Sequence, residues 1–333
     1  MQKSLRRPVT LKDVAAAAGV SYQTVSRAIN GFGEINAETS QRVLKIAAEL
    51  GYRPNRLANS LRSAKSKALG LVVSDIENLF FAEVAAGVEA EATERGYSVL
   101  LANTSEDIHR ERTAILNLFE SRVDGLIVAP AEGEHDFLKT DLPETFPVVA
   151  INRSLSSPLY GAVLSENREG AGAAVEYLVT RGHTKIGAVV GSPNLMTSQE
   201  RLDGFRSAME RLGLPIERHW TAAGTIYPKG ACEAAIEILK RSDRPTAIIT
   251  SSQRITQGVL MALRHLGLRH GVDVELVGFD DFPWAALLDP PVTVIAQDTH
   301  NIGRKAVAML LGMITGTGEA AEIRLPTRLV VPS

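Results

Sequence analysis

Side chains that could read DNA bases cluster between residues 22 and 27. A helix turns by about 100° per residue, which places one polar set on a single face: Tyr22, Gln23, Ser26 and Arg27. Glutamine can bond an adenine edge at two atoms and arginine a guanine edge, while tyrosine and serine can reach bases or phosphates. An ordinary surface helix also has a polar face, so the flanking residues must decide between the two interpretations.

Those flanking residues predict a helix-turn-helix. Thr10 and Asp13 have the spacing of a capping box, which begins a helix. Gly19 suits the position after that helix, because a residue there often needs a positive φ. Ser21 can cap a second helix only two residues later, and this helix would carry the polar face described above.

A third helix and a basic segment follow. Asn36 can cap this helix, whose apolar side chains recur at the spacing of one helix face and would pack on the first two helices: Val43, Ile46, Ala47 and Leu50. Residues 53–67 then read RPNRLANSLRSAKSK, with Leu57 and Leu61 on one side of a short helix. So short a helix is unstable alone, so the segment is either a basic linker or a helix that forms on DNA.

The net charge of −2 conceals a strong asymmetry along the chain. Residues 1–67 contain 12 basic and 4 acidic side chains, a net charge of +8. The remainder contains 24 basic and 34 acidic side chains, a net charge of −10. A basic head on an acidic body is typical of a polyanion-binding module joined to a second kind of domain.

Composition excludes several classes of protein. A chain of 333 residues with 45% hydrophobic content suggests two or three domains with substantial cores. It has no apolar run of membrane-spanning length, and MQKSLRRP lacks the apolar region of a secretory signal. The single cysteine, Cys232, excludes an intramolecular disulfide framework. We therefore expect a cytoplasmic protein, associated with the nucleoid, that binds no membrane, and we expect no metal site and no cofactor.

From residue 68 onward, short apolar runs alternate with helical stretches. The first series of strand-like runs is ALGLVVS, YSVLLAN, DGLIVAP and PVVAIN, and the second is KIGAVVG, TAIITS, VELVGFD and TVIAQ. Such alternation predicts parallel, doubly wound sheets, and two series predict two lobes.

Polar residues follow these strands where ligands bind in open α/β sheets. They are Asp75, Asn152, Ser252, Asp280 and Gln297, with the aromatic side chains of Phe80, Phe81 and Trp284 just beyond two of them. Polar groups beside flat rings suit a sugar-like ligand, which has hydroxyls at its edges and C–H groups on its faces. The alternative is that Asp75 and Asp280 merely cap the helices that follow them.

The whole chain resembles the lactose-repressor (LacI/GalR) family of bacterial regulators. The resemblance is strongest over residues 9–62, in VTLKDVAAAAGVSYQTVSRAIN and INAETSQRVLKIAAELGYRPN. It implies an all-α helix-turn-helix headpiece at 1–53, a hinge helix at 54–67 that wedges Leu61 into the minor groove, and a core at 68–333 of two doubly wound, periplasmic-binding-protein-like lobes. The helix near 301–315 should then return to the first lobe. The implied contacts to double-stranded operator DNA come from Thr10, Ser21, Tyr22, Gln23, Thr24, Ser26, Arg27, Asn30, Asn55, Arg56, Leu57, Ala58 and Leu61.

In the core, the resemblance implies an effector site. Arg201 in ERLDGF matches an effector-contacting arginine, and Asp280 in VGFDD matches an acceptor for sugar hydroxyls. Many relatives have an Asn-Asp pair where this chain has Ser252-Gln253, followed by Arg254. A fixed positive charge there favours an anionic effector such as a sugar acid or sugar phosphate, unless Arg254 faces solvent or pairs with a carboxylate across the lobes. Arg201 could supply the anion contact instead. The full expected set is Asp75, Phe80, Phe81, Asn152, Arg153, Arg201, Ser252, Arg254, Asp280, Trp284 and Gln297.

The sequence thus predicts a transcription regulator, most simply a repressor, whose operator affinity is set by a small sugar-like effector. A regulator whose core responds to a partner protein remains the alternative. An enzyme is disfavoured, because the GTGEAA run at 316–321 follows a helix instead of a strand, and no P-loop or nucleophile elbow is present. A homodimer is expected, because the chain has no leucine-heptad tail of the kind that tetramerises the lactose repressor.

Overall fold

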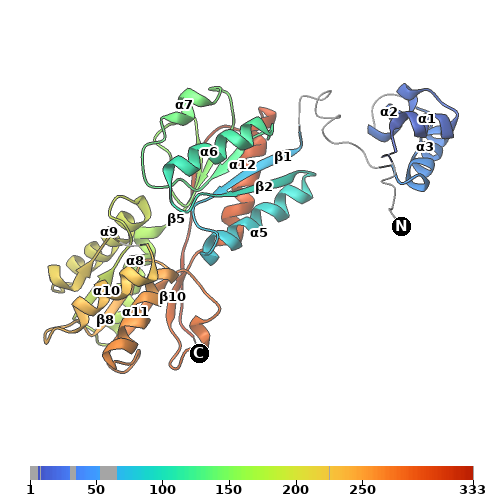
Figure 1. Ribbon diagram of the computed structural model, residues 1–333. Coiled ribbons are helices and arrows are strands. Elements are labelled where there is room, and N and C mark those ends of the chain that lie inside the picture. The colour runs from blue at the N-terminus through green and yellow to red at the C-terminus, as the bar shows by residue number, and fades with distance from the viewer. Residues whose placement is uncertain (1–6, 8, 31–34, 53–65, 225, 333) are drawn as a thin grey trace. The chain divides into compact units, whose positions relative to one another are not determined.

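The computed structural model describes residues 7, 9–30, 35–52, 66–224 and 226–332 (Figure 1). The chain divides into two compact units, a headpiece within Met1–Ser66 and a core within Lys67–Ser333. Most of the expected hinge segment at 54–67 lies outside the described residues, including Asn55, Arg56, Leu57, Ala58 and Leu61.

The described part of the headpiece consists of α1 (Leu11–Ala18), α2 (Tyr22–Asn30) and α3 (Ala37–Glu49). Asp13 and Thr10 form the predicted capping box, in which the Asp13 carboxylate accepts the Thr10 N–H at 2.7 Å. Gly19 ends α1 with a φ of 65°, and Ser21 Oγ accepts the Thr24 N–H at 3.1 Å to begin α2. The predicted helix-turn-helix is therefore confirmed.

A small apolar core joins these helices. Val14, Val25 and Val43 are fully buried, one from each helix. The prediction that Leu50 joins this core is wrong, because its side chain is 40% exposed. Leu50 lies just beyond the last residue of α3, at the C-cap, where the chain turns away before Gly51 adopts a left-handed φ.

The first lobe of the core is built on a parallel sheet in the order β11-β5-β4-β3-β1-β2. Helices α5 (Leu79–Glu94) and α12 (Thr299–Thr315) pack on one face, and α6 (Ile108–Glu120) and α7 (Phe137–Asp141) on the other. The strands are β1 (Ala68–Val73), β2 (Ser98–Asn103), β3 (Leu126–Val128), β4 (Val148–Ile151), β5 (Gly161–Ser165) and β11 (Glu322–Leu325).

The second lobe repeats this plan in the order β12-β10-β9-β8-β6-β7, with β12 antiparallel to β10. Helices α10 (Pro228–Leu239) and α11 (Gln253–Leu266) pack on one face, and α8 (Asn167–Thr180) and α9 (Met196–Arg211) on the other. The strands are β6 (Ile186–Val189), β7 (Thr221–Ala222), β8 (Ala247–Thr250), β9 (Glu275–Phe279), β10 (Thr293–Ala296) and β12 (Arg328–Val330).

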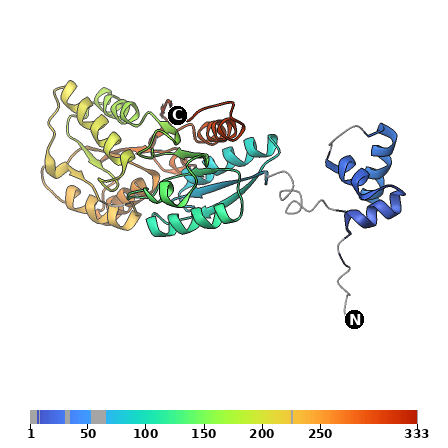
Figure 2. The same cartoon turned by 90° about the horizontal axis from the view of Figure 1, so that it is seen from above.

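Helix α12 returns from the second lobe to the first, as predicted (dark red in Figure 2). It packs closely on α5, where a Cβ atom at Gly303 would collide with the Val84 carbonyl oxygen. Within the described core, the chain passes between the lobes three times: after β5, after β10 and after β11. These connections join the two sheets, and a cleft lies between the lobes. Among the described helices, none is long and apolar enough to cross a membrane.

Candidate DNA-binding face and effector cleft

The polar face of α2 is presented as the sequence predicted. Val25 and Ala28 are buried, whereas Tyr22, Gln23 and Arg27 are exposed on the opposite side. The other expected headpiece contacts lie at helix ends: Thr10 caps α1, Ser21 and Thr24 share a hydroxyl hydrogen bond of 2.8 Å at the start of α2, and Asn30 is its last residue. Their contacts to DNA stay predictions.

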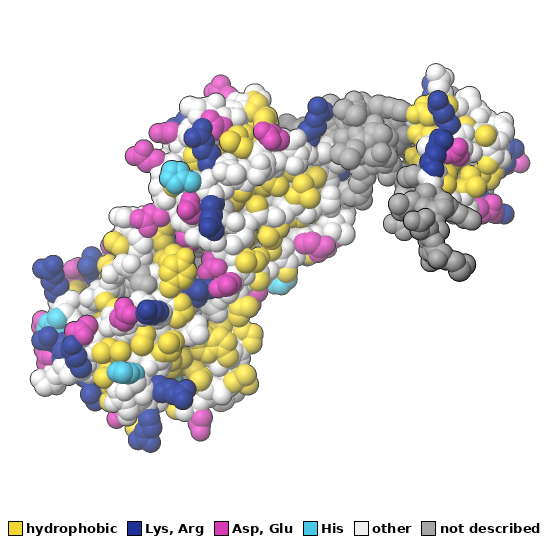
Figure 3. Space-filling model, in the orientation of Figure 1, with side chains coloured by type: hydrophobic (Ala, Val, Ile, Leu, Met, Phe, Trp, Pro, Cys, Tyr) yellow, Lys and Arg dark blue, Asp and Glu magenta, His cyan; other side chains and the backbone are white. Residues whose placement is uncertain are grey.

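The core has a different surface. On the face shown in Figure 3, acidic and basic side chains are interspersed over both lobes, with no continuous basic stripe. The predicted positive excess therefore belongs to residues 1–67, and the face of the core in view offers no polyanion-binding surface.

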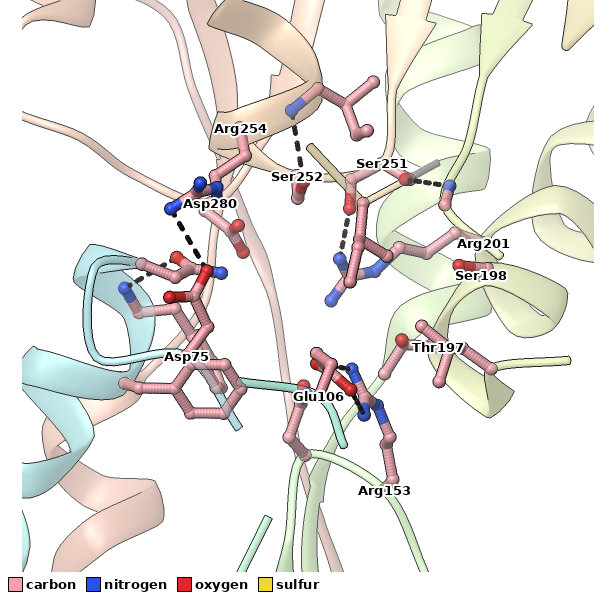
Figure 4. Close-up of a pocket in the computed structure, with 18 of the residues that line it drawn as sticks. Asp75, Glu106, Arg153, Thr197, Ser198, Arg201, Ser251, Ser252, Arg254 and Asp280 are labelled. Carbon is pink, nitrogen blue, oxygen red and sulfur yellow. Dashed lines mark hydrogen bonds and ion pairs between the residues drawn. The ribbon is translucent and has the colours of Figure 1, made fainter. Parts of the chain in front are cut away.

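A cleft between the two lobes brings together most of the expected effector residues (Figure 4). It contains a cavity of about 70 Å³. The first lobe contributes Asp75, Asn78, Phe80, Phe81, Glu106, Asn152 and Arg153, and the second contributes Gly191, Leu195, Thr197, Ser198, Arg201, Ile226, Ser251, Ser252, Arg254, Ile255 and Asp280, with Gln297 at the second connection.

Strained backbone marks this cleft. Glu106, Asn152 and Asp280 line it with φ angles of 58°, 67° and 75°, in the left-handed region. Asparagine and aspartate tolerate that region better than most residues, yet such conformations persist only where the surrounding structure enforces them. Here the enforced bends follow β2, β4 and β9 and turn polar side chains into the cleft (Figure 4).

Asp280 is an acceptor held in place by its neighbours. Its side chain accepts the Gln297 amide N–H at 2.6 Å through Oδ1 and the Gln253 backbone N–H at 3.1 Å through Oδ2. The second bond caps α11, so Asp280 does cap a helix, although not the one that follows it in sequence. Asp75 does not cap the following helix either, because Asn78 begins α5. The remaining lone pairs of the Asp280 carboxylate can still accept ligand hydroxyls.

Arg201 is buried, and protein acceptors hold two of the five N–H groups of its guanidinium. Its Nε donates to Asn167 Oδ1 at 2.8 Å, one terminal N–H donates to the Ser251 carbonyl oxygen, and the guanidinium lies 3.7 Å from the centre of the Phe279 ring. Burial lowers the pKa of Arg201 to about 10, opposed in part by Asp280 and Glu200, so the side chain is still cationic at neutral pH.

Arg254 is paired across the lobes. Its NH1 atom lies 3.1 Å from Asp75 Oδ2 and 3.4 Å from Glu77 Oε2, and its guanidinium lies 5.5 Å from the centre of the Tyr227 ring. Burial raises the pKa of Asp75, and the Arg254 charge opposes part of that rise. The argument for an anionic effector required this arginine to lack a partner, and in the structure it has two carboxylates.

Arg153 is also neutralised. Its two terminal nitrogens bond both oxygens of Glu106, at 2.8 and 2.7 Å, and NH1 also donates to the Pro130 carbonyl oxygen at 2.6 Å. This bidentate pair forms the floor of the cleft in Figure 4. Its planar geometry fixes both side chains.

One expected site residue is misplaced, and several lining residues were missed. Trp284 does not line the cleft; it stacks on Phe282 at 4.0 Å between ring centres, within the second lobe. Thr197 and Ser198 precede Arg201 by four and three residues, so the helical repeat could have found them on the same side of α9. Glu106 follows the end of β2, where the strand-end rule also applied.

Comparison with known proteins agrees with this architecture. Residues 10–55 match the model of bacterial regulatory proteins of the lacI family, and residues 175–332 match a periplasmic binding protein-like domain. The HTH-type transcriptional repressor PurR of Photobacterium profundum is 33% identical over 307 residues, 91% of each chain. The ribose operon repressor of Haemophilus influenzae is 32% identical over 310 residues, 93% of each chain.

Solved structures show the same likeness. A Burkholderia thailandensis structure, provisionally named a ribose operon repressor, shares 60% identity with a TM-score of 0.76 and covers 80% of this chain and 99% of that chain. The lac repressor dimer bound to operator and the anti-inducer ONPF shares 30% identity with a TM-score of 0.85 over 98% of both chains. The chain belongs to the lacI family of bacterial regulatory proteins. It is a DNA-binding transcriptional repressor controlled by a small molecule, and not an enzyme.

Proposed function

We propose that this repressor is controlled by a neutral, pentose-like sugar, ribose or a close relative, bound in the cleft between the lobes. The observation that carries the proposal is that two of the three arginines lining the described cleft, Arg153 and Arg254, are already paired with carboxylates, while Arg201 keeps terminal N–H groups that can donate to a ligand hydroxyl. An anionic ligand that bound Arg153 or Arg254 would have to displace Glu106 or Asp75. A neutral ligand needs no such exchange.

The remaining cleft groups suit hydroxyls. Asp280, Asn152 and Asp75 offer acceptor atoms, and Ser198 and Thr197 offer hydroxyls that can donate or accept. The cavity of about 70 Å³ leaves no room for a large ligand in this arrangement of the lobes. These features favour a monosaccharide.

A flat purine base fits the cleft less well. Phe80 and Phe81 meet edge to face, with 84° between their planes, so they form no parallel slot for a flat ring. Trp284 lies outside the cleft, packed on Phe282. Two relatives named as ribose operon repressors, one of them 60% identical, support the same choice.

On the DNA side, we propose that a homodimer presents two copies of α2 to the two halves of a pseudo-palindromic operator. A two-fold dimer reads half-sites related by the same symmetry. Gln23 and Arg27 would contact base edges, and Tyr22 and Ser26 bases or phosphates. Leu61 and its neighbours at 55–58 are proposed hinge contacts by resemblance alone, since they lie outside the described residues.

The test of the effector is calorimetry on the full chain with D-ribose, ribose 5-phosphate, ribonate and hypoxanthine. We expect D-ribose to bind most tightly, with binding lost in Asp280→Asn and kept in the matched control Trp284→Phe, whose side chain lies in the same lobe but outside the cleft. Tighter binding of ribonate or of the phosphate would contradict the neutral-sugar proposal. Binding of none of the four would favour the partner-protein alternative.

A further inference from the structure

Two of the connections between the lobes lie side by side. Glu166 follows β5 on the first connection, and its N–H donates to the Leu325 carbonyl oxygen at 2.9 Å on the third. A second hydrogen bond joins the same segments: Thr327 Oγ1 donates to the Glu166 carbonyl oxygen at 3.4 Å. Any change in the angle between the lobes must therefore act on these two segments together.

One buried carboxylate from the second lobe contacts a residue at each of these connections. Glu200, on α9, accepts the Asn167 amide N–H at 2.8 Å through Oε2 and pairs with Arg324 at 2.9 Å through Oε1. Asn167 is the first residue of α8, directly after the first connection. Arg324 lies on β11, directly before the third, and β11 belongs to the sheet of the first lobe. The Glu200–Arg324 pair therefore crosses between lobes.

The same network reaches the cleft. Asn167 is 1% exposed, and its other side-chain atom, Oδ1, accepts the Nε–H of Arg201 at 2.8 Å. Because both ends of the amide are bonded, it cannot turn over without breaking one contact. A displacement of Arg201 is thus passed to Glu200, and from Glu200 to Arg324, through charged or buried hydrogen bonds that are stiff in a low-dielectric interior.

We propose that Glu200, with Arg324 as its partner on the first lobe, is a positioning residue that couples effector binding at Arg201 to the lobe connections. This inference rests on the proposed function, because Arg201 must sense the effector. Neither Glu200 nor Arg324 lines the cleft, so neither contacts the ligand. Their role is to give the ligand-bound and the ligand-free protein different lobe arrangements. The two arrangements then differ in affinity for operator.

A matched control exists on the same two helices. Arg168 on α8 pairs with Asp203 on α9 at 2.9 Å, but both side chains are largely exposed, and neither has a described contact with Arg201 or with β11. Asp203→Asn removes an ion pair between α8 and α9 without touching the network. This variant therefore shows whether losing any ion pair between α8 and α9 affects coupling, or only losing the contacts of Glu200.

The experiment measures operator affinity of the full chain with and without saturating D-ribose, for wild type, Glu200→Gln, Arg324→Gln, the double variant and Asp203→Asn. The coupling factor is the ratio of the two operator dissociation constants, and ordinary allosteric systems give about 5- to 150-fold. We expect each single variant to lower it well below the wild-type value without abolishing it, while the ribose dissociation constant of the free protein changes less than about threefold. Asp203→Asn should keep the wild-type factor.

The double variant distinguishes a shared role from two separate ones. If Glu200 and Arg324 act as one unit, the double variant loses no more coupling than either single variant. Arg324→Lys, which keeps a charge near Glu200, should recover part of the factor. A wild-type coupling factor in Arg324→Gln, even with a lower melting temperature, would show a purely structural pair and overturn the proposal. A wild type that binds no ribose would instead overturn the proposed function, and this inference with it.

Discussion

At the scale of single residues, the cleft uses side chains that serve the fold and the ligand together. Asp280 adopts a left-handed φ, and its one carboxylate both caps α11 through the Gln253 N–H and orients Gln297. Its position is therefore set before any ligand arrives. Such preorganisation lowers the entropic cost of binding.

Substitutions at Asp280 should separate these two roles. Asp280→Asn keeps the short polar side chain suited to a left-handed φ, so we expect a folded protein that has lost at least about tenfold in ribose affinity, or about 1.4 kcal/mol. Asp280→Ala also leaves the Gln253 N–H without its acceptor, which should cost about 1–3 kcal/mol of unfolding free energy. Calorimetry and denaturant unfolding measure the two effects. Wild-type ribose affinity in Asp280→Asn would contradict the assigned role.

Asp75 should give the core a recognisable pH dependence. Burial raises its pKa in the folded protein, so between that raised value and its ordinary value of about 3.9 the folded state binds more protons than the unfolded state. The contribution of Asp75 to the unfolding free energy therefore rises as the pH falls through this window. Denaturant unfolding of wild type and Asp75→Asn at several pH values isolates this contribution of Asp75. A difference between the two that is constant with pH would refute the expectation.

At the scale of elements, helix ends and most strands of the first lobe could be predicted, whereas β5 and β11 could not. Thr10, Gly19 and Ser21 act locally, so their residue types alone indicate where α1 ends and α2 begins. The central strands are apolar throughout because both faces are covered. β5 begins with glycine and β11 alternates polar and apolar residues at the sheet edge, so neither has that signature.

Some site residues could likewise be predicted from the sequence, and others could not. Strand ends identified Asp75, Asn152 and Asp280, because the carboxyl ends of parallel strands meet at one edge of a sheet. Nothing in the local sequence shows that Arg254 faces Asp75 from the other lobe, since the pairing depends on how two sheets are joined. Trp284 was misplaced for a different reason: its side chain packs on Phe282 within one lobe, which residue type and strand-end position do not show.

The α2 helix makes a testable claim about base reading. Arg27→Ala should relax base preference at one position of each half-site and cost about 1–3 kcal/mol on operator, with a much smaller loss on random DNA. Arg42, an exposed arginine on α3, is the matched control, and Arg42→Ala should affect both DNAs alike. Fluorescence anisotropy at fixed salt compares them. Equal losses on the two DNAs for Arg27→Ala would remove it as a base reader.

At the scale of the whole molecule, contacts across the mouth of the cleft hold the two lobes together. Arg254 bonds Asp75, and its neighbour Gln253 donates to Asn78 Oδ1 at 2.9 Å. Both donors lie at the start of α11 and both acceptors precede α5. The contacts form only when the lobes are close, so they favour the closed arrangement whether or not a ligand is present.

Arg254→Ala should therefore weaken binding of neutral and acidic sugars alike, because it loosens closure and leaves the Asp75 carboxylate without its nearest positive charge. Glu77→Gln is the control, since the Glu77 side chain is 78% exposed and its pairing with Arg254 should contribute little. Calorimetry with D-ribose and ribonate measures both variants. A loss in Arg254→Ala confined to ribonate would restore the anionic-effector interpretation.

The central claim joins the two units: a neutral sugar in the core sets the affinity of the headpiece for operator. The most direct measurement is fluorescence anisotropy of the full chain on an operator selected from random DNA, with D-ribose or ribose 5-phosphate. We predict that D-ribose changes the operator dissociation constant by about tenfold or more, that operator changes ribose affinity by the same factor, and that Asp280→Asn abolishes both effects. An operator affinity unchanged by D-ribose but shifted by ribose 5-phosphate would contradict the account.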